Sequence, residues 1–134
     1  MRVTILDYGA GNLHSLQKAL SCAGATVAIE ADPRLAAATD VLVLPGVGAF
    51  STAAEHFAAD REYLHSAITD GLPTLGICLG MQLLFDSSDE GPGRGLGVIP
   101  GSVERIRASR IPHIGWNSVS PVSSRRATAR IETA

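Results

Sequence analysis

The sequence has few aromatic residues, only two cysteines and no long apolar run. Aromatic residues make up 4% of the chain, so its core has to be built mainly from aliphatic side chains. Two cysteines, Cys22 and Cys78, are too few for a disulfide framework, and they fit a cytosolic protein in which one thiol has a chemical task. The longest uncharged run, residues 72–85, is too short to span a bilayer. We therefore expect a cytoplasmic protein that does not cross a membrane.

The length and charge of the chain narrow its class. A length of 134 residues indicates one domain, and 46% apolar residues suffice for a packed core. The formal net charge of −2 argues against non-specific nucleic-acid binding. The charge is uneven, because residues 91–134 carry seven of the eleven basic residues and only two of the thirteen acidic ones. This basic part is either a solvated surface or a docking face for an acidic partner or a phosphate-bearing substrate.

Short β-rich segments alternate with helical patterns through residues 1–90. We expect strands at residues 3–6, 26–29, 41–44 and 74–77, of which the strand at residues 41–44 is apolar on both faces and should be central. We expect helices at residues 12–23 and 79–85 and a helix or helix pair at residues 51–70. Asn12 can cap the first helix, and Asp32 and Pro33 can open a short helical turn. The alternation predicts an α/β fold with an open, mostly parallel sheet and helices on both faces. Beyond it we expect a glycine-rich loop at residues 91–97 and an antiparallel or edge strand at residues 102–107.

The best candidate for a reactive group is Cys78. Residues 76–80 read Gly-Ile-Cys-Leu-Gly, and this pattern lets a chain turn sharply from a strand into a helix. The side chain between the glycines then projects from the carboxyl edge of the sheet, where open α/β sheets bind ligands. The N–H of Leu79 would be placed to stabilise an oxyanion. The alternative is that Cys78 is a small buried hydrophobe. Cys22 lacks the flanking glycines and lies in the expected helix at residues 12–23, so we interpret it as a structural residue.

Residues 76–82, Gly-Ile-Cys-Leu-Gly-Met-Gln, resemble the nucleophile signature of class I glutamine amidotransferases. These enzymes hydrolyse the side-chain amide of glutamine and pass the ammonia to a synthase partner. The resemblance implies that Cys78 attacks the amide carbon to form a glutamyl thioester. It also implies that Gln82, one helical turn later, helps to hold the substrate, and that the site needs no metal and no cofactor.

A second segment, residues 45–50 with the sequence Pro-Gly-Val-Gly-Ala-Phe, resembles the oxyanion loop of the same family. The resemblance implies that the N–H of Val47 or Gly48 is the second oxyanion donor. Gly46 and Gly48 would let the backbone approach the substrate closely and would allow a peptide to flip. Pro-Gly-x-Gly is common in turns and is a weak signal alone. Here it follows the expected strand at residues 41–44, which is the strand that precedes the Cys78 strand, and this position supports the interpretation.

Two further segments narrow the resemblance to the glutaminase subunits of imidazole glycerol phosphate synthases. They are residues 5–13, Ile-Leu-Asp-Tyr-Gly-Ala-Gly-Asn-Leu, and residues 112–117, Pro-His-Ile-Gly-Trp-Asn. This implies a heterodimer with a (β/α)8-barrel cyclase that makes imidazole glycerol phosphate and AICAR from PRFAR in histidine biosynthesis. Asn12 and Trp116 would lie toward the interface that ammonia crosses.

Other interpretations stay open at this point. The chain could be another class I glutaminase, such as the partner of pyridoxal phosphate synthase, or a non-catalytic module that binds the cyclase. Residues 9–11, Gly-Ala-Gly, could belong to a dinucleotide-binding turn, although His14 stands where that fingerprint has its third glycine. Trp116 could be an ordinary core residue.

The sequence departs from the family pattern in one respect. A cysteine nucleophile needs a general base oriented by a third group, and the family takes both from a His-Pro-Glu motif. No His-Pro-Glu occurs in the 134 residues, and none of the four histidines matches it: His14, His56, His65 and His113. We therefore expect an incomplete glutamine amidotransferase domain over residues 1–120, a divergent and poorly ordered tail over residues 121–134, and impaired turnover.

Overall fold

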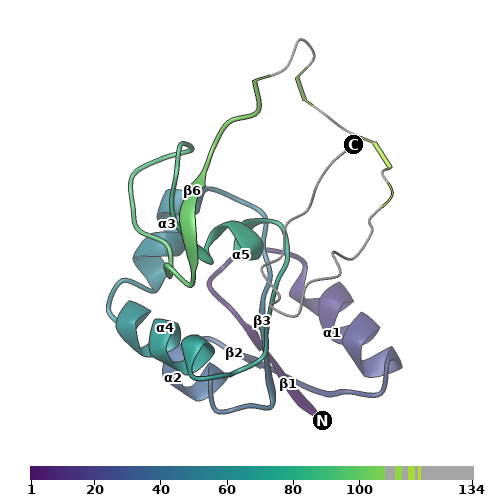
Figure 1. Cartoon of the computed structure of the whole chain (residues 1–134). Helices are drawn as coiled ribbons and strands as arrows, with labels where there is room; N and C mark the ends of the chain where they lie inside the picture. Colours follow the sequence, from purple (N-terminus) through teal and green to yellow (C-terminus); the bar gives the residue numbers. More distant parts are fainter. Residues whose placement is uncertain (108–110, 113–114, 117, 119–134) are drawn as a thin grey trace.

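The computed structural model describes residues 1–107, 111–112, 115–116 and 118, and it shows an open parallel sheet with helices on both faces (Figure 1). The sheet has four strands in the order β2-β1-β3-β4. Their bounds are β1 (Arg2–Leu6), β2 (Thr26–Glu30), β3 (Val41–Leu44) and β4 (Thr74–Gly76). All three strand pairings are parallel. The predicted α/β class is therefore confirmed.

The strand β3 is central, as its sequence predicts. It pairs with β1 on one side and with β4 on the other. Leu42, Val43 and Leu44 are each at most 1% exposed, which is the burial expected of a parallel strand covered on both faces. The carboxyl ends of β1, β3 and β4 therefore lie next to one another, and the loops that follow them meet at one edge of the sheet.

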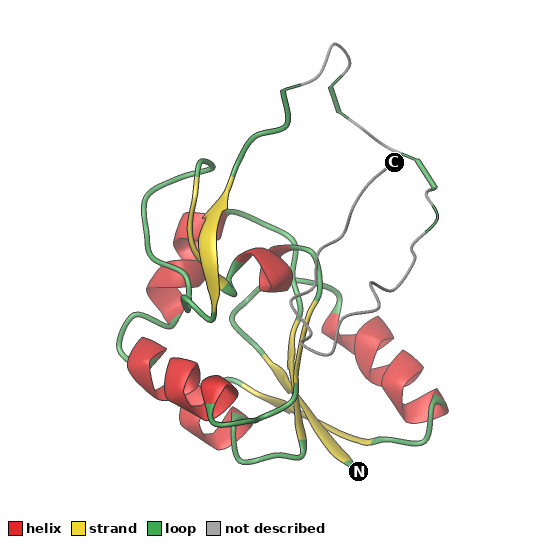
Figure 2. Cartoon of the chain, viewed as in Figure 1, coloured by secondary structure: helices red, strands yellow, loops and turns green. Residues whose placement is uncertain are grey.

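Helices cover both faces of this sheet (Figure 2). The helix α1 (Leu13–Cys22) covers one face, where Leu13, Leu16 and Leu20 pack on Val3, Ile5 and Val43. The opposite face is covered by α2 (Pro33–Ala36), α3 (Phe50–His56) and α4 (Arg61–Thr69). Of the two possibilities expected at residues 51–70, a helix or a helix pair, the structure shows the pair.

The starts of α1 and α2 follow from their capping residues. The Oδ1 atom of Asn12 accepts the N–H of Ser15 at 3.1 Å. The Oδ1 atom of Asp32 accepts the N–H of Arg34 at 2.8 Å, and Pro33 occupies the first position of α2. Both caps confirm the sequence predictions.

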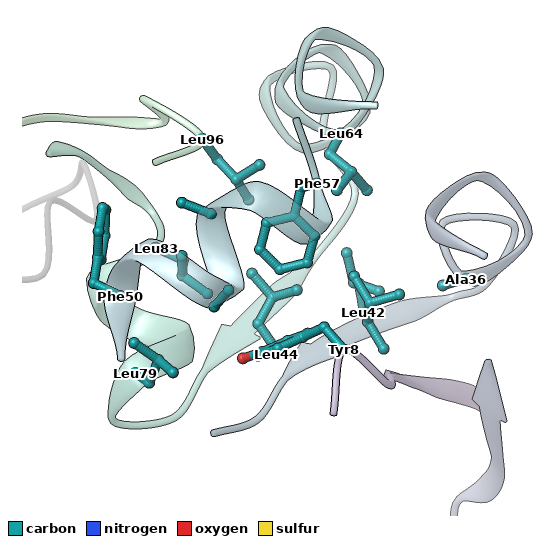
Figure 3. Packing of buried hydrophobic residues seen from close by; sticks show 13 residues of the cluster. Tyr8, Ala36, Leu42, Leu44, Phe50, Phe57, Leu64, Leu79, Leu83 and Leu96 are labelled. Atoms are coloured by element: carbon teal, nitrogen blue, oxygen red, sulfur yellow. The ribbon is translucent and has the colours of Figure 1, made fainter. Parts of the chain in front are cut away.

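The larger core cluster contains more aromatic residues than we expected (Figure 3). Phe50 and Phe57 are the largest fully buried side chains, and Tyr8 is only 6% exposed. The Tyr8 and Phe57 rings meet edge to face, with their centroids 5.0 Å apart. Both faces of the sheet are nevertheless covered mainly by aliphatic side chains, as the composition predicts, and the aromatic residues are concentrated on the face opposite α1.

The helix predicted directly after Cys78 is longer than the helix in the structure. The helix expected at residues 79–85 is only α5 (Leu79–Gln82), and it is followed by the strand β5 (Phe85–Ser88). The helix ends early because the carbonyl groups of Leu83 and Leu84 accept the N–H groups of Leu96 at 2.7 Å and Ile99 at 2.9 Å. Backbone N–H groups of residues 96 and 99 thus take the place of the N–H groups that a further helical turn would supply.

The antiparallel or edge strand expected at residues 102–107 is β6 (Ile99–Val103), which begins and ends earlier than predicted. It is an edge strand of a two-stranded sheet, and its pairing with β5 is parallel. Its register is held by side chains, since the N–H of Gly101 donates to Asp86 Oδ2 at 2.7 Å and the hydroxyls of Ser87 and Ser102 are 3.1 Å apart. The described helices are all too short or too polar to be candidates for a membrane span.

Candidate functional site

The thiol of Cys78 lies at the junction between β4 and α5. Cys78 adopts φ 52° and ψ −110°, and it is the one non-glycine residue with positive φ among the described residues. Such a conformation costs about 1–3 kcal/mol, and it is typical of a nucleophile on a strained strand-to-helix turn. Cys78 is exposed. The alternative interpretation of Cys78 as a buried hydrophobe is therefore wrong.

The two glycines that flank Cys78 are required by close backbone packing. A Cβ built on Gly76 would lie 2.7 Å from the Cα of Met81, in the next turn of the chain. A Cβ built on Gly80 would collide with the carbonyl oxygen of Leu44 on β3. That oxygen also accepts the N–H of Ile77 at 2.9 Å. The Gly-x-Cys-x-Gly pattern is thus what lets the turn fold tightly onto the sheet.

Gln82 lies one helical turn after Cys78, because its N–H donates to the Cys78 carbonyl at 3.1 Å. It is half-buried. Its side chain borders a cavity of about 770 Å³, whose other lining residues are Asp89, Glu90, Val103, Glu104, Arg105, Ile106, Ile111 and Pro112. The cavity contains charged groups of both signs, but neither Cys78 nor the loop at residues 45–48 lines it.

The Pro-Gly-Val-Gly loop, residues 45–48, lies against the start of α5. A Cβ built on Gly46 would be 3.1 Å from the Cβ of Leu79, which is itself 2% exposed. Gly46 and Gly48 have φ values of 152° and 131°, a region that favours glycine. The structure therefore brings together the two segments that the sequence predicts to form one site.

The predicted oxyanion donors are the backbone N–H groups of Leu79, Val47 and Gly48. None of the three makes a hydrogen bond to a described residue. Val47 is 67% exposed. Free backbone donors beside a reactive thiol are the groups that stabilise the negative oxygen of a tetrahedral intermediate.

Tyr8 also lies against the glycine loop, although its motif did not mark it as a candidate site residue. Its hydroxyl is buried, has no hydrogen-bond partner among the described residues, and lies 2.9 Å from where a Cβ on Gly46 would be. Burial, and second the neighbouring Cys78, raise the pKa of this hydroxyl above its ordinary value. Its signal was its position: Tyr8 is two residues past β1, at the same sheet edge as Cys78.

The two predicted interface residues lie apart from the thiol turn in the sequence, and both are exposed. Asn12 is exposed at the start of α1, where it serves as the cap. Trp116 is fully exposed, at 105% relative exposure, so the alternative interpretation of Trp116 as a core residue is wrong. His113, Ile114 and Asn117 of the same motif lie outside the described residues.

The part of the chain that the structure describes contains no cluster of three or more His, Cys, Asp or Glu side chains that could hold a metal ion. Residues 9–11 lie beside the thiol site, since a Cβ on Gly11 would be 3.4 Å from the Cα of Gly46. The dinucleotide interpretation of these glycines is not tested by this geometry.

Comparison with known proteins gives a consistent result. The family model of glutamine amidotransferase class-I matches residues 4–132. The imidazole glycerol phosphate synthase subunit HisH of Synechococcus elongatus is 50% identical over 124 residues, which cover 88% of this chain and 57% of that protein. The proteins of the same name from Thermus thermophilus and Methanothermobacter thermautotrophicus are 47% and 48% identical, with 62% and 60% of their lengths covered. The chain thus spans about three-fifths of the length of these relatives.

The family match runs past residue 120, where we expected the domain to end. The boundary at residue 120 and the tail at residues 121–134 stay predictions, because residues 119–134 lie outside the described residues.

Proposed function

The chain belongs to the class-I glutamine amidotransferase family, and from this premise we propose that it carries the thiol half of a glutaminase site, which hydrolyses glutamine to glutamate and ammonia. The observation that carries the proposal is the exposed, strained Cys78 held between two packed glycines. A side chain kept in a costly conformation at the carboxyl edge of a sheet needs a functional reason.

The proposed reaction follows from the groups around Cys78. The thiolate attacks the carboxamide carbon of glutamine, and the carbonyl oxygen becomes negative in the tetrahedral intermediate. The N–H of Leu79 and that of Val47 or Gly48 donate to this oxygen. The nitrogen of the former amide takes up a proton as the intermediate collapses, so the C–N bond breaks, ammonia leaves and a glutamyl thioester remains on Cys78. Water then attacks the thioester, releasing glutamate and the free thiol.

Substrate binding in this proposal uses residues on both sides of the thiol. Gln82 offers an amide that both donates and accepts hydrogen bonds, one turn of helix after Cys78. Gly46 and Gly48 carry no side chains, so the substrate can lie directly on the loop backbone. No metal and no cofactor enters the reaction.

The reaction also needs a proton carrier, first for the leaving ammonia and then for the attacking water. The 134 residues contain no His-Pro-Glu. We therefore expect these residues by themselves to form the thioester slowly. Turnover should fall below that of a site with a base by roughly 10⁴- to 10⁶-fold, as when a nucleophile loses its histidine.

The partner is proposed from the names of the relatives. They are subunits of imidazole glycerol phosphate synthase, so we propose that this chain binds a (β/α)8-barrel cyclase as a heterodimer in the cytoplasm. Ammonia would pass to the cyclase, which makes imidazole glycerol phosphate and AICAR from PRFAR in histidine biosynthesis. The exposure of Asn12 and Trp116 supports this, because exposed aromatic residues are enriched at interfaces. The relatives' names do not favour the pyridoxal phosphate synthase alternative.

A second candidate function is a non-catalytic module that binds the cyclase without releasing ammonia. It shares the cyclase partner with the first candidate and differs from it only in turnover. The experiment that separates the two mixes the chain with a purified cyclase and measures both co-elution and ammonia release from glutamine. Co-elution with slow release that Cys78→Ala abolishes supports the glutaminase. Co-elution with no release above that of Cys78→Ala supports the module. Cys22→Ser is the matched control, because Cys22 is also exposed but lies in α1.

A further inference from the structure

The Tyr8 hydroxyl is a buried polar group without a partner. Tyr8 is 6% exposed, and its hydroxyl oxygen makes no hydrogen bond with any described residue. Buried hydroxyls almost always have a partner, because an unpaired one loses its contacts with water and gains nothing in return. Phenylalanine would fill the same space without that cost. The hydroxyl therefore calls for a reason other than packing.

The surroundings of Tyr8 fix the direction of its hydroxyl. The ring is held edge to face against Phe57 in the larger core cluster. Its oxygen points toward the Leu79 end of that cluster (Figure 3). A Cβ on Gly46 would lie 2.9 Å from the Tyr8 oxygen and 3.1 Å from the Leu79 Cβ. The hydroxyl is thus packed against the glycine loop, on the side of α5.

The loop that Tyr8 faces is not fixed by hydrogen bonds. The N–H groups of Gly46, Val47 and Gly48 donate to no described residue. Both glycines have positive φ, so neither resists rotation of its peptides through the clash that a side chain would cause. Turning a peptide N–H toward the substrate turns the carbonyl of the same peptide the opposite way. That carbonyl then needs a donor.

We propose that Tyr8 is a positioning residue of the glutaminase site, and that its hydroxyl donates a hydrogen bond to a carbonyl of the loop at residues 45–48 when the loop presents an N–H to the oxyanion. The proposal rests on the proposed function, because it assumes that a carboxamide is attacked at Cys78.

The test compares two reagents that make different demands on the site. Iodoacetamide alkylates a thiolate by direct displacement and needs no oxyanion donor. A chloromethyl ketone analogue of glutamine passes through a tetrahedral adduct, so its reaction needs the loop in place. In Tyr8→Phe, we expect the chloromethyl ketone to label Cys78 about tenfold more slowly, which corresponds to ~1.4 kcal/mol for one hydrogen bond. The iodoacetamide rate should stay unchanged.

The matched control is Tyr63→Phe, which removes the same hydroxyl from an exposed ring on α4. Both of its labelling rates should equal those of the unmodified chain. The melting temperature supplies a further readout. Tyr8→Phe removes an unpaired buried group, so its melting temperature should be equal or higher. A purely structural role for the hydroxyl predicts a lower one.

Three outcomes would overturn the proposal. Equal slowing of both reagents in Tyr8→Phe, with a lower melting temperature, would make Tyr8 a structural residue. Unchanged labelling by the chloromethyl ketone in Tyr8→Phe would remove its role while leaving the proposed function intact. An unmodified chain that reacts with iodoacetamide but not with the chloromethyl ketone would overturn the proposed function and, with it, the role of Tyr8.

Discussion

Gly80 lies directly against the carbonyl oxygen of Leu44, and this contact fixes where the thiol turn sits on the sheet. No side chain fits between them, since a Cβ on Gly80 would collide with that oxygen. The contact links the helix that follows Cys78 to the strand that precedes the glycine loop. It thereby places the nucleophile and the two predicted oxyanion donor segments in one site.

Gly80→Ala should therefore destabilise the protein. The added methyl meets backbone rather than a flexible side chain, so either α5 or β3 has to shift. We expect the free energy of unfolding to fall by about 2–3 kcal/mol, measured as a lower urea midpoint. Gly115→Ala is the matched control, because a Cβ there meets nothing within 4 Å. Equal midpoints for the two variants would show that the contact with Leu44 does not constrain the turn.

The strain at Cys78 gives a second prediction. Cys78→Gly removes the side chain that makes φ 52° unfavourable, so the free energy of unfolding should rise by about 1 kcal/mol although the reactive thiol is lost. Cys78→Ala loses the thiol but keeps the Cβ, and it should show no gain. If alanine stabilises as much as glycine, the gain comes from removing sulfur and not from relieving the backbone.

Asn12 combines a structural role with a proposed interface role, and two substitutions separate them. Asn12→Ala removes the cap on Ser15 and should cost about 1 kcal/mol of stability. Asn12→Asp keeps a capping oxygen and should cost little. We expect both variants to bind the cyclase more weakly in isothermal titration. If only Asn12→Ala binds more weakly, Asn12 acts through the helix and not through the interface.

Trp116 has a proposed interface role and, because its side chain is fully exposed, no role in packing. Trp116→Ala should change the free energy of unfolding by no more than about 0.5 kcal/mol, so the melting temperature should stay nearly the same. It should weaken cyclase binding by about 2 kcal/mol, or ~30-fold, if the ring is buried by the partner. Tyr63→Ala removes another exposed aromatic residue and should not change the affinity. Equal affinities for all three chains would place the interface elsewhere.

The sequence predicted the elements whose signals are local. The strands at residues 41–44 and 74–77 were read from apolar runs, and the cap at Asn12 from one polar side chain before a helical pattern. The need for Gly76 and Gly80 followed from the sharpness of the turn, and the structure shows the backbone contacts that require both. Local signals suffice where the cause and the effect lie within a few residues.

The failures all depend on contacts between distant segments. The end of α5 is set by Leu96 and Ile99, more than ten residues downstream. The orientation of β6 depends on its pairing with β5. Pro100 and Gly101 are unfavourable in strands, so the sequence does not indicate that β6 begins at Ile99. The Tyr8 hydroxyl is buried because the loop at Gly46, far away in the sequence, packs against it. The pattern of apolar residues within one segment does not predict contacts of this kind, because the partner lies in another segment.

The measurement that tests the central claim most directly is peptide mapping by mass spectrometry after treatment with the chloromethyl ketone analogue of glutamine. Cys78 and Cys22 are both exposed, so reactivity alone does not distinguish them. A glutaminase site predicts one adduct, on Cys78, whose formation is slowed by added glutamine and not by asparagine. Equal labelling of both cysteines, or labelling of Cys78 that glutamine does not slow, would contradict the account.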